Sequence, residues 1–253
     1  NDGVGIGTFT SNISGLNYGS NYHVRAYATN SVGTAYGVDI PFSTPIYPTI
    51  TTTAITAITA SAAISGGNVT SDGGDVITSR GVCWSTSVNP TINDFKTMDG
   101  VGIGTFTSNI SGLNYGNNYH VRAYATNSVG TAYGVDISFS TPNYPTITTT
   151  AITAITSTTA ISGGNVTSDG GDAVTSRGVC WSTSVNPTIS DFKTTDGVGA
   201  GTFTSNITGL LSNTSYHLRA YASNNVGTTY GEDKVLVTSE TITDYDGNIY
   251  NTV

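Results

Sequence analysis

Hydrophobic and polar residues alternate along short stretches of this chain, and the alternation predicts β-strands. The clearest stretch covers residues 119–125. One face carries Tyr119, Val121, Ala123 and Ala125, and the other carries His120, Arg122 and Tyr124. Further strands are predicted at 49–56, 62–69, 77–85, 104–110 and 131–141. The stretch 89–104 is expected to be a loop with at most a short edge strand, and turns rich in Gly, Asn and Asp separate the rest.

The pattern returns with a period of 97 residues. Asp2-Gly3-Val4-Gly5 recurs from Asp99 and again from Asp196, and residues 2–44 differ from 99–141 at only two positions. Solenoid repeats of 20–50 residues cannot bury a core alone, whereas about 97 residues suit an independent sandwich. The sequence therefore predicts an all-β fold, with tandem Greek-key β-sandwich domains arranged as beads on a string.

Prolines mark the predicted domain boundaries. Pro45 and Pro48 bracket one of them, because proline cannot donate to a sheet ladder and suits a joint between domains. The predicted organisation is the C-terminal half of a repeat, two complete repeats and the start of a following module. These four segments are residues 1–44, 45–141, 142–238 and 239–253.

The composition excludes several partners. Only 9% of the residues are charged, and the formal net charge is −8 with a pI near 4.5. Eight Lys and Arg residues over 253 cannot provide the basic surface that nucleic acid or an anionic membrane requires. No apolar stretch approaches the roughly 20 residues of a membrane span. We expect no nucleic-acid partner and no membrane insertion of this segment.

Each cysteine and histidine is a single position copied by the period. Cys83 and Cys180 lie 97 residues apart, so neither has a partner inside its own repeat, and both are expected to be small buried residues. One histidine per repeat cannot form a metal cluster. With nearby Arg and Tyr, the histidines form a predicted outward row. Its members are His23, Arg25, Tyr27, His120, Arg122, Tyr124, His217, Arg219 and Tyr221. The row is expected to be a solvated sheet face, and the alternative is a binding strip repeated along the array.

No arrangement for catalysis is found, so no enzyme and no cofactor are expected. No strand-turn-helix context surrounds a serine, and Gly100-x-Gly102-x-Gly104 precedes a strand instead of opening a helix. Asp72 and Asp75, like Asp169 and Asp172, lie in Gly-rich turns, where forming the turn is their expected role. A Ca²⁺ site in these turns, or at Asp244-x-Asp246-Gly247-Asn248, remains an alternative.

The stretch from Leu113 to Gly130 resembles the signature of fibronectin type III domains, with a Leu, a Tyr six residues later and an alternating strand ending in Asn and Gly. The pairs are Leu16/Tyr22, Leu113/Tyr119 and Leu210/Tyr216. The resemblance implies that each Tyr forms a tyrosine corner, its hydroxyl bonding back to the preceding loop. Such domains usually carry a core Trp on the second strand, where this chain has Gly66-Gly67 and Gly163-Gly164. Trp84 and Trp181 on the third strand are expected to fill that space from the opposite sheet.

These repeats resemble those of large secreted or surface-attached proteins of Bacteroidota. The tail from Thr243 to Val253 resembles the opening of the FISUMP domain, a module found at the end of such proteins. The resemblance implies a non-enzymatic extracellular spacer, stalk or adhesin whose partners are neighbouring repeats. Two alternatives stay open: a carbohydrate-binding repeat protein that uses glycans or other cell-surface ligands, and a self-assembling filament of copies completed by strand exchange.

Overall fold

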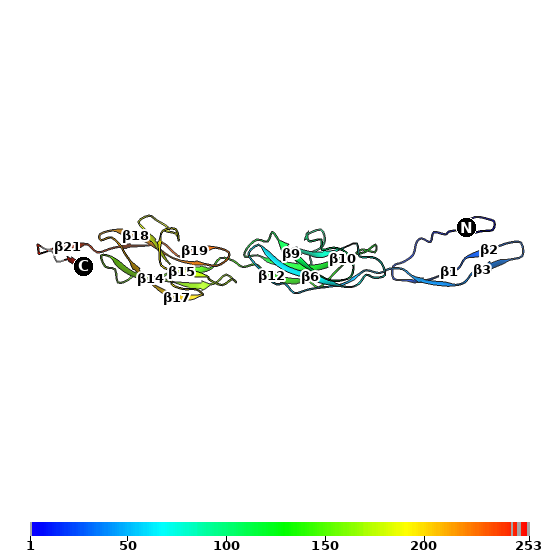
Figure 1. Cartoon of the computed structure of the whole chain (residues 1–253), viewed down its shortest axis with the longest axis horizontal. Helices are drawn as coiled ribbons and strands as arrows, with labels where there is room; N and C mark the ends of the chain where they lie inside the picture. The colour runs from blue at the N-terminus through cyan, green and yellow to red at the C-terminus, as the bar shows by residue number, and fades with distance from the viewer. Residues whose placement is uncertain (1, 244, 247–248, 252–253) are drawn as a thin grey trace. The chain divides into compact units, whose positions relative to one another are not determined.

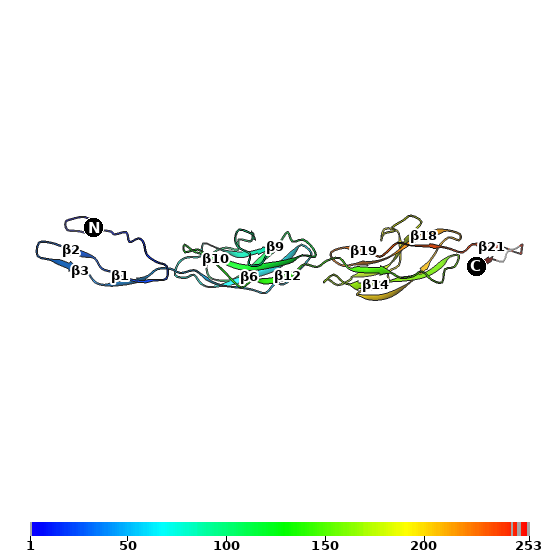
Figure 2. The ribbon, with the colours of Figure 1, turned by 180° about the vertical axis from the view of Figure 1, so that it is seen from behind.

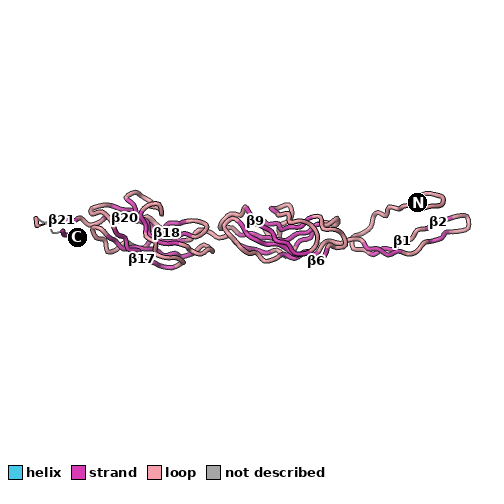
Figure 3. Tube along the Cα trace, viewed as in Figure 1, coloured by secondary structure: helices cyan, strands magenta, loops and turns pink. Residues whose placement is uncertain are grey.

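The computed structural model describes residues 2–243, 245–246 and 249–251. Within these residues the regular elements are β-strands, and Figure 3 shows strands joined by loops. No helix in the described part of the chain is long and apolar enough to cross a membrane. The chain divides into two compact units, the second of which contains the whole of residues 142–238.

Residues 142–238 form a two-layer β-sandwich (Figure 1). One sheet has the order β13-β14-β17, with bounds β13 (Thr146–Thr149), β14 (Thr159–Ser168) and β17 (Gly201–Thr208). The other has the order β16-β15-β18-β19, and β20 also pairs with β18. The bounds are β15 (Ser176–Ser182), β16 (Phe192–Lys193), β18 (Ser215–Ser223), β19 (Thr228–Tyr230) and β20 (Lys234–Val237). All the pairs with a described register are antiparallel.

Residues 45–141 repeat this topology (Figure 2). The first sheet contains β5 (Thr49–Thr52), β6 (Ala62–Ser71) and β9 (Gly104–Ser111). The second contains β7 (Ser79–Ser85), β8 (Phe95–Lys96), β10 (Asn118–Thr126), β11 (Thr131–Tyr133) and β12 (Ile137–Ser140). The all-β Greek-key sandwich predicted from the alternation is confirmed, including the short edge strand β8.

The first 44 residues contain two strand pairs. β1 (Asn21–Val24) pairs with β4 (Ile40–Ser43), and β2 (Tyr27–Thr29) pairs with β3 (Thr34–Tyr36). Near the other end, β21 (Thr241–Thr243) pairs with β22 (Ile249–Asn251). The predicted module start at 239–253 extends over residues 244, 247–248 and 252–253, which lie outside the described residues.

The core of the second repeat consists of two clusters between the sheets. The larger one contains Ala160, Val179, Trp181, Ile207, Leu210, Tyr216, Leu218 and Leu236, and the smaller one contains Ile147, Val166, Val174, Ala220 and Ala222. Phe203 packs against both clusters and joins them. Leu218 and Ala220 are fully buried. Alternate residues of β18 therefore supply both clusters, as the period-two pattern requires.

The space of the missing second-strand tryptophan is filled by Phe203 and Ala220. A Cβ atom built on Gly164 would lie 2.7 Å from the Ala220 Cβ and 2.9 Å from the Phe203 ring. Only a residue without a side chain fits there. Trp181 is buried in the larger cluster. Trp84 and Trp181 are buried core residues on the opposite sheet, and the atoms nearest to the missing Gly164 side chain belong to Phe203 and Ala220.

The predicted strand 131–141 is divided into β11 and β12 by a threonine from the opposite sheet. The Thr52 hydroxyl accepts the Ala123 N–H at 3.0 Å and donates to the Val135 carbonyl at 2.7 Å. A Cβ on Gly134 would lie 2.4 Å from the Thr52 hydroxyl oxygen, so glycine is needed for this approach. Thr149 makes the same two bonds in the second repeat, to Ala220 and Glu232. One hydroxyl therefore links the two sheets of each repeat.

Replacing Thr149 with Val removes this hydroxyl at nearly constant volume and leaves a buried N–H and a carbonyl without their partner. We expect Thr149→Val to lower the free energy of unfolding of the second repeat by about 1–3 kcal/mol. The measurement is urea denaturation in a Trp84→Phe background, where Trp181 alone reports by fluorescence. Thr148→Val, at an exposed position of the same strand, is the control. Equal stability of the two variants would contradict the role given to the hydroxyl.

Candidate functional site

A tyrosine fixes the start of the central strand in each repeat. The Tyr216 hydroxyl accepts the Leu211 N–H at 3.0 Å, and the Tyr119 hydroxyl accepts the Asn114 N–H at 3.0 Å. Tyr22 does the same with Asn17 at 2.9 Å. The adjacent leucines of the two complete repeats, Leu113 and Leu210, are buried. Each tyrosine thereby satisfies a loop N–H, and the rings of Tyr119 and Tyr216 pack in the core, the arrangement of a tyrosine corner.

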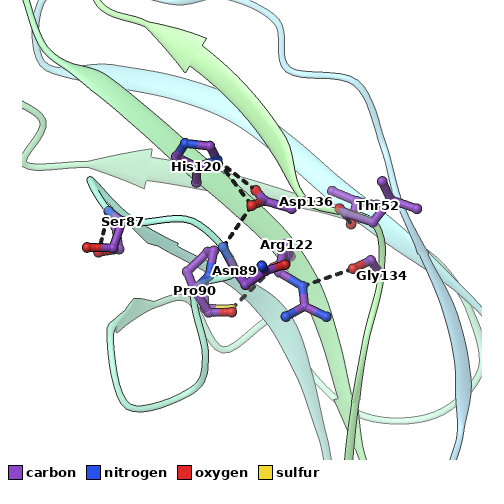
Figure 4. A network of polar contacts seen from close by, with 11 residues as sticks. Thr52, Ser87, Asn89, Pro90, His120, Arg122, Gly134 and Asp136 are labelled. Carbon is purple, nitrogen blue, oxygen red and sulfur yellow. Dashed lines mark hydrogen bonds and ion pairs between the residues drawn. The ribbon is translucent and has the colours of Figure 1, made fainter.

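On the outer face of the same sheet, a histidine and an aspartate hold a loop (Figure 4). His120 Nδ1 lies 3.1 Å from both carboxylate oxygens of Asp136, and Asp136 also accepts the Asn89 N–H at 2.7 Å. In the second repeat, Asp233 accepts the N–H of Asn186 and contacts His217, both at 2.9 Å. The imidazole and the loop share one carboxylate. The arrangement therefore attaches the loop between β7 and β8 to Asp136, the residue directly before β12.

The arginine of the predicted row is also engaged inside the repeat. Arg122 Nε donates to the Gly134 carbonyl at 3.0 Å, and its guanidinium lies 4.6 Å from the centroid of the Tyr133 ring. The Tyr133 hydroxyl accepts the Ile92 N–H at 3.1 Å. Arg219 and Tyr230 repeat this cation–π contact at 4.7 Å. The row is thus partly covered by the loop 86–94 and is not an open strip.

Tyr124 and Tyr221 keep the predicted alternation with Val121 and Ala123 or with Leu218 and Ala220, but the solvent exposure expected of them is wrong. Each is only 2% exposed, and the Tyr124 hydroxyl donates to the Thr97 carbonyl at 2.7 Å. Tyr124 lies opposite Gly81 on the neighbouring strand, and a Cβ there would come within 2.9 Å of the tyrosine ring. The glycine leaves room for the ring to lie across the sheet. The glycine opposite each tyrosine is visible in the sequence and indicates room for the ring. Pairing the two residues, however, requires the strand register.

The thiols are buried beneath the same loop. Cys83 and Cys180 have no exposed surface, and the Cys83 Sγ–H lies 3.3 Å from the Pro90 carbonyl that accepts it. Burial raises the pKa of both thiols to about 11, against the weaker opposing effect of the neighbouring arginine. The thiolate is the nucleophilic form, and at neutral pH it is suppressed.

The aspartates of the Gly-rich turns accept backbone hydrogen bonds. Asp72 accepts the Gly74 N–H at 2.9 Å, and Asp75 accepts the Val76 N–H at 2.8 Å. Hydrogen bonds from the Ser128 side chain and from Val76 lower the pKa of Asp75. Among the described residues, no group of three His, Cys, Asp or Glu side chains could hold a metal ion. Asp244 and Asn248 of the half calcium loop lie outside the described residues.

The Gly-rich segment before β9 presents its carbonyls to an arginine. Arg80 Nη1 donates to the carbonyls of Gly102 at 3.1 Å and Ile103 at 2.9 Å, and its guanidinium lies 5.2 Å from the Phe106 ring. A phosphate-binding loop would direct its N–H groups toward the ligand. Here the carbonyl oxygens surround a cation, so the segment is anchored from within the repeat.

A feature that sequence reasoning missed is an asparagine that holds the first residues of each repeat. Asn224 Nδ2 donates to the carbonyls of Asn143 at 2.8 Å and Asp169 at 2.9 Å. Asn143 also donates its N–H to Gly170 at 2.8 Å. The adjacent Pro142 accepts the N–H of Gly116 at 2.9 Å. Asn224 lies at the asparagine position of the fibronectin type III signature, where the sequence predicted a turn. Its partners are 81 and 55 residues away and could not be identified from local sequence.

The fold defines the class of this protein: tandem β-sandwich repeats of the fibronectin type III and immunoglobulin-like kind. No protein-family model matches the chain, and no curated protein matches it. Among solved structures, titin domains A168–A170 are 17% identical, with 87% of this chain and 75% of that chain covered at a TM-score of 0.35. The chicken CNTN1 FN1–FN3 domains are 15% identical, with 86% and 75% covered at 0.32. The class therefore rests on the strand order of the repeats themselves.

The raised thiol pKa makes the cysteines a probe of folding. At about pH 8 we expect Cys83 and Cys180 to react with a thiol reagent only when urea unfolds the chain, because the native thiols are protonated and covered. The thiol pKa rises from 9.0 to about 11 on folding. The contribution of the buried thiols to the free energy of unfolding is therefore complete below pH 9 and is lost as the pH rises through about 11. Rapid labelling of the native chain would contradict this account.

Proposed function

We propose that this chain is a non-enzymatic spacer or stalk within a bacterial surface or secreted protein. The observation that carries the proposal is that the groups capable of chemistry are used inside each repeat. His120 shares Asp136 with a loop, Cys83 is covered, and Asp75 holds a turn. The reactive side chains of each repeat therefore stabilise one sandwich, and a stable sandwich suits a mechanical role.

The start of each repeat is suited to carrying force. Asn224 links the carbonyl of Asn143, where the repeat begins, to the end of β18, its central strand. Tension applied at Asn143 would reach β18 through this side chain as well as through the backbone. Prolines 142 and 145 flank the linked residues and restrict the backbone there. We infer that the joints transmit load into the sandwich and that the array separates a terminal module from its attachment point.

Stretching single molecules tests this proposal. We expect two unfolding events, each releasing close to the extended length of 97 residues, about 320–350 Å, less the folded length of a domain. Asn224→Ala should lower the unfolding force of one event and leave the other unchanged, because only the second repeat loses its link. Asn225→Ala, at an exposed neighbouring position, should change neither event. Traces with no two events of equal length would contradict the proposal.

A ligand-binding function is the second candidate, favoured by an exposed phenylalanine at the same position of each complete repeat. Phe95 and Phe192 are 71% and 70% exposed, and their rings stack on Trp84 and Trp181 with centroids 5.9 and 6.0 Å apart. An exposed ring supported by a second ring offers a flat apolar surface to a sugar. The surface is nevertheless one phenylalanine wide and lies on a two-residue edge strand.

A glycan array separates the two candidates. If the chain is a spacer, we expect no glycan to bind the full chain at millimolar concentration. The matched variant is the double substitution Phe95→Ala and Phe192→Ala. Glycan binding that is present in the parent chain and lost in this variant would replace the spacer function with the carbohydrate-binding one.

A further inference from the structure

One sheet of each complete repeat ends in a long strand that has a neighbour on one side only. In residues 142–238 the sheet order is β13-β14-β17, and β17 has eight residues. Its pairing with β14 keeps one register along its whole length, from Thr208 opposite Thr159 to Gly201 opposite Val166. β9 holds the same position beside β6, and residues 105–110 and 202–207 are identical in sequence. The same unpaired edge is therefore present in both complete repeats.

Alternate residues of β17 direct their backbone groups away from the sheet. Ile161 of β14 exchanges both backbone hydrogen bonds with Thr153, so Ile161 and the residues that alternate with it face away from β17. The residues between them, such as Ser162 opposite Ser205, make the hydrogen bonds to β17. The other residues of β17 therefore have their N–H and carbonyl groups at the free edge. They are Thr202, Thr204, Asn206 and Thr208, all with exposed side chains. In the described part of the chain, no backbone hydrogen bond reaches these groups.

The other sheet edges of the repeat carry features that prevent pairing between molecules. Such features are short strands, charged residues, prolines and bulges. β16 has two residues, one of which is Lys193, and β20 has four and begins at Lys234. β19 has three residues. β13 has four residues, follows Pro145 and has an irregular register at its start. β17 is longer and contains no charge, proline or register shift.

The free edge of β17 is complementary to itself. An antiparallel pair of two such strands, with Ser205 on the two-fold axis, places Thr202 opposite Thr208 and Thr204 opposite Asn206. All four residues have their backbone groups at the free edge, so each opposed pair can exchange both hydrogen bonds. The opposed side chains are neutral and polar, and threonine pairs stabilise neighbouring strands. The corresponding register for β9 has Ser108 on the axis.

The neutrality of β17 indicates which partner strand fits it. The chain carries a formal net charge of −8, so surfaces that bear its carboxylates repel one another. Residues 201–208 contain no Asp, Glu, Lys or Arg, and two such strands therefore oppose no like charges. A strongly acidic or basic partner strand would find no opposite charge on β17. A neutral strand rich in Thr and Asn matches it, and β9 and β17 of a second copy are such strands.

We infer that β9 and β17 are docking edges for the same strands of a second copy, so that two three-stranded sheets join into one continuous sheet. Each sandwich stays complete in this association, which differs from strand exchange because no core is opened. The edge contributes hydrogen bonds and contacts of Thr and Asn but little apolar area, so the association is weak and reversible. It joins copies side by side and is independent of the spacer role.

Sedimentation equilibrium of the full chain tests the inference. We expect the average molar mass to rise above 26.0 kDa as the concentration approaches about 1 mM. The double substitution Thr107→Lys and Thr204→Lys should weaken the association more than tenfold, because it opposes like charges at both edges. Its control is Thr51→Lys with Thr148→Lys, the same charge change at exposed positions of β5 and β13, which should associate like the parent. A parent chain that stays monomeric, or equal association of the two double variants, would overturn the inference.

Disulfide formation between copies tests the register. A mixture of two full-length variants, Thr204→Cys and Asn206→Cys, should cross-link faster under oxidation than either variant alone, because these positions lie opposite each other in the antiparallel pair. Cys83 and Cys180 are fully buried and do not compete. Faster cross-linking of Thr204→Cys alone would indicate parallel pairing and contradict the proposed register, as would equal rates for the mixture and the single variants.

Discussion

The central strand of each repeat, β18 in residues 142–238, contacts its neighbours in its own sheet and the opposite sheet. This strand pairs with β15 on one side and with β19 and β20 on the other, so its backbone is hydrogen-bonded along both edges. Its inward residues Leu218 and Ala220 are fully buried, and Ala220 also donates its N–H to Thr149 of the opposite sheet. Burial of the inward face of this strand against the opposite sheet is the constraint on which the other contacts depend.

The polar groups of the repeat are arranged around the same strand. Near its start, the Tyr216 hydroxyl accepts a hydrogen bond from the preceding loop. On its outer face, His217 contacts the aspartate that holds a loop, and Arg219 contacts Tyr230 of β19. Asn224, directly after its end, holds the first residues of the repeat. Because these contacts satisfy buried or half-buried groups, they contribute to stability and leave few side chains for chemistry. The proposed spacer function follows from this use of the polar residues.

The sequence predicted the features that depend on local alternation and on the period. Strand positions, the sandwich architecture and the burial of Cys83 and Cys180 follow from residues close in sequence or from exact copying. The burial of Tyr124 could not be predicted in this way, because it depends on Gly81 in another strand and on a carbonyl at Thr97. The division of the last strand depends on Thr52, which is 83 residues from the carbonyl that it contacts. Such contacts require the strand register, which alternation alone does not provide.

The central claim is that each 97-residue repeat is one self-contained sandwich built around its central strand. Native-state hydrogen exchange of the full chain tests it most directly, since amides buried in a cooperative unit exchange only when that unit unfolds. We predict that the paired amides of β15 and β18 exchange slowest and with a common free energy. The same pattern should recur 97 residues earlier, in β7 and β10. Exchange of the β18 amides at the rate of loop amides, or protection in only one of the two repeats, would contradict the account.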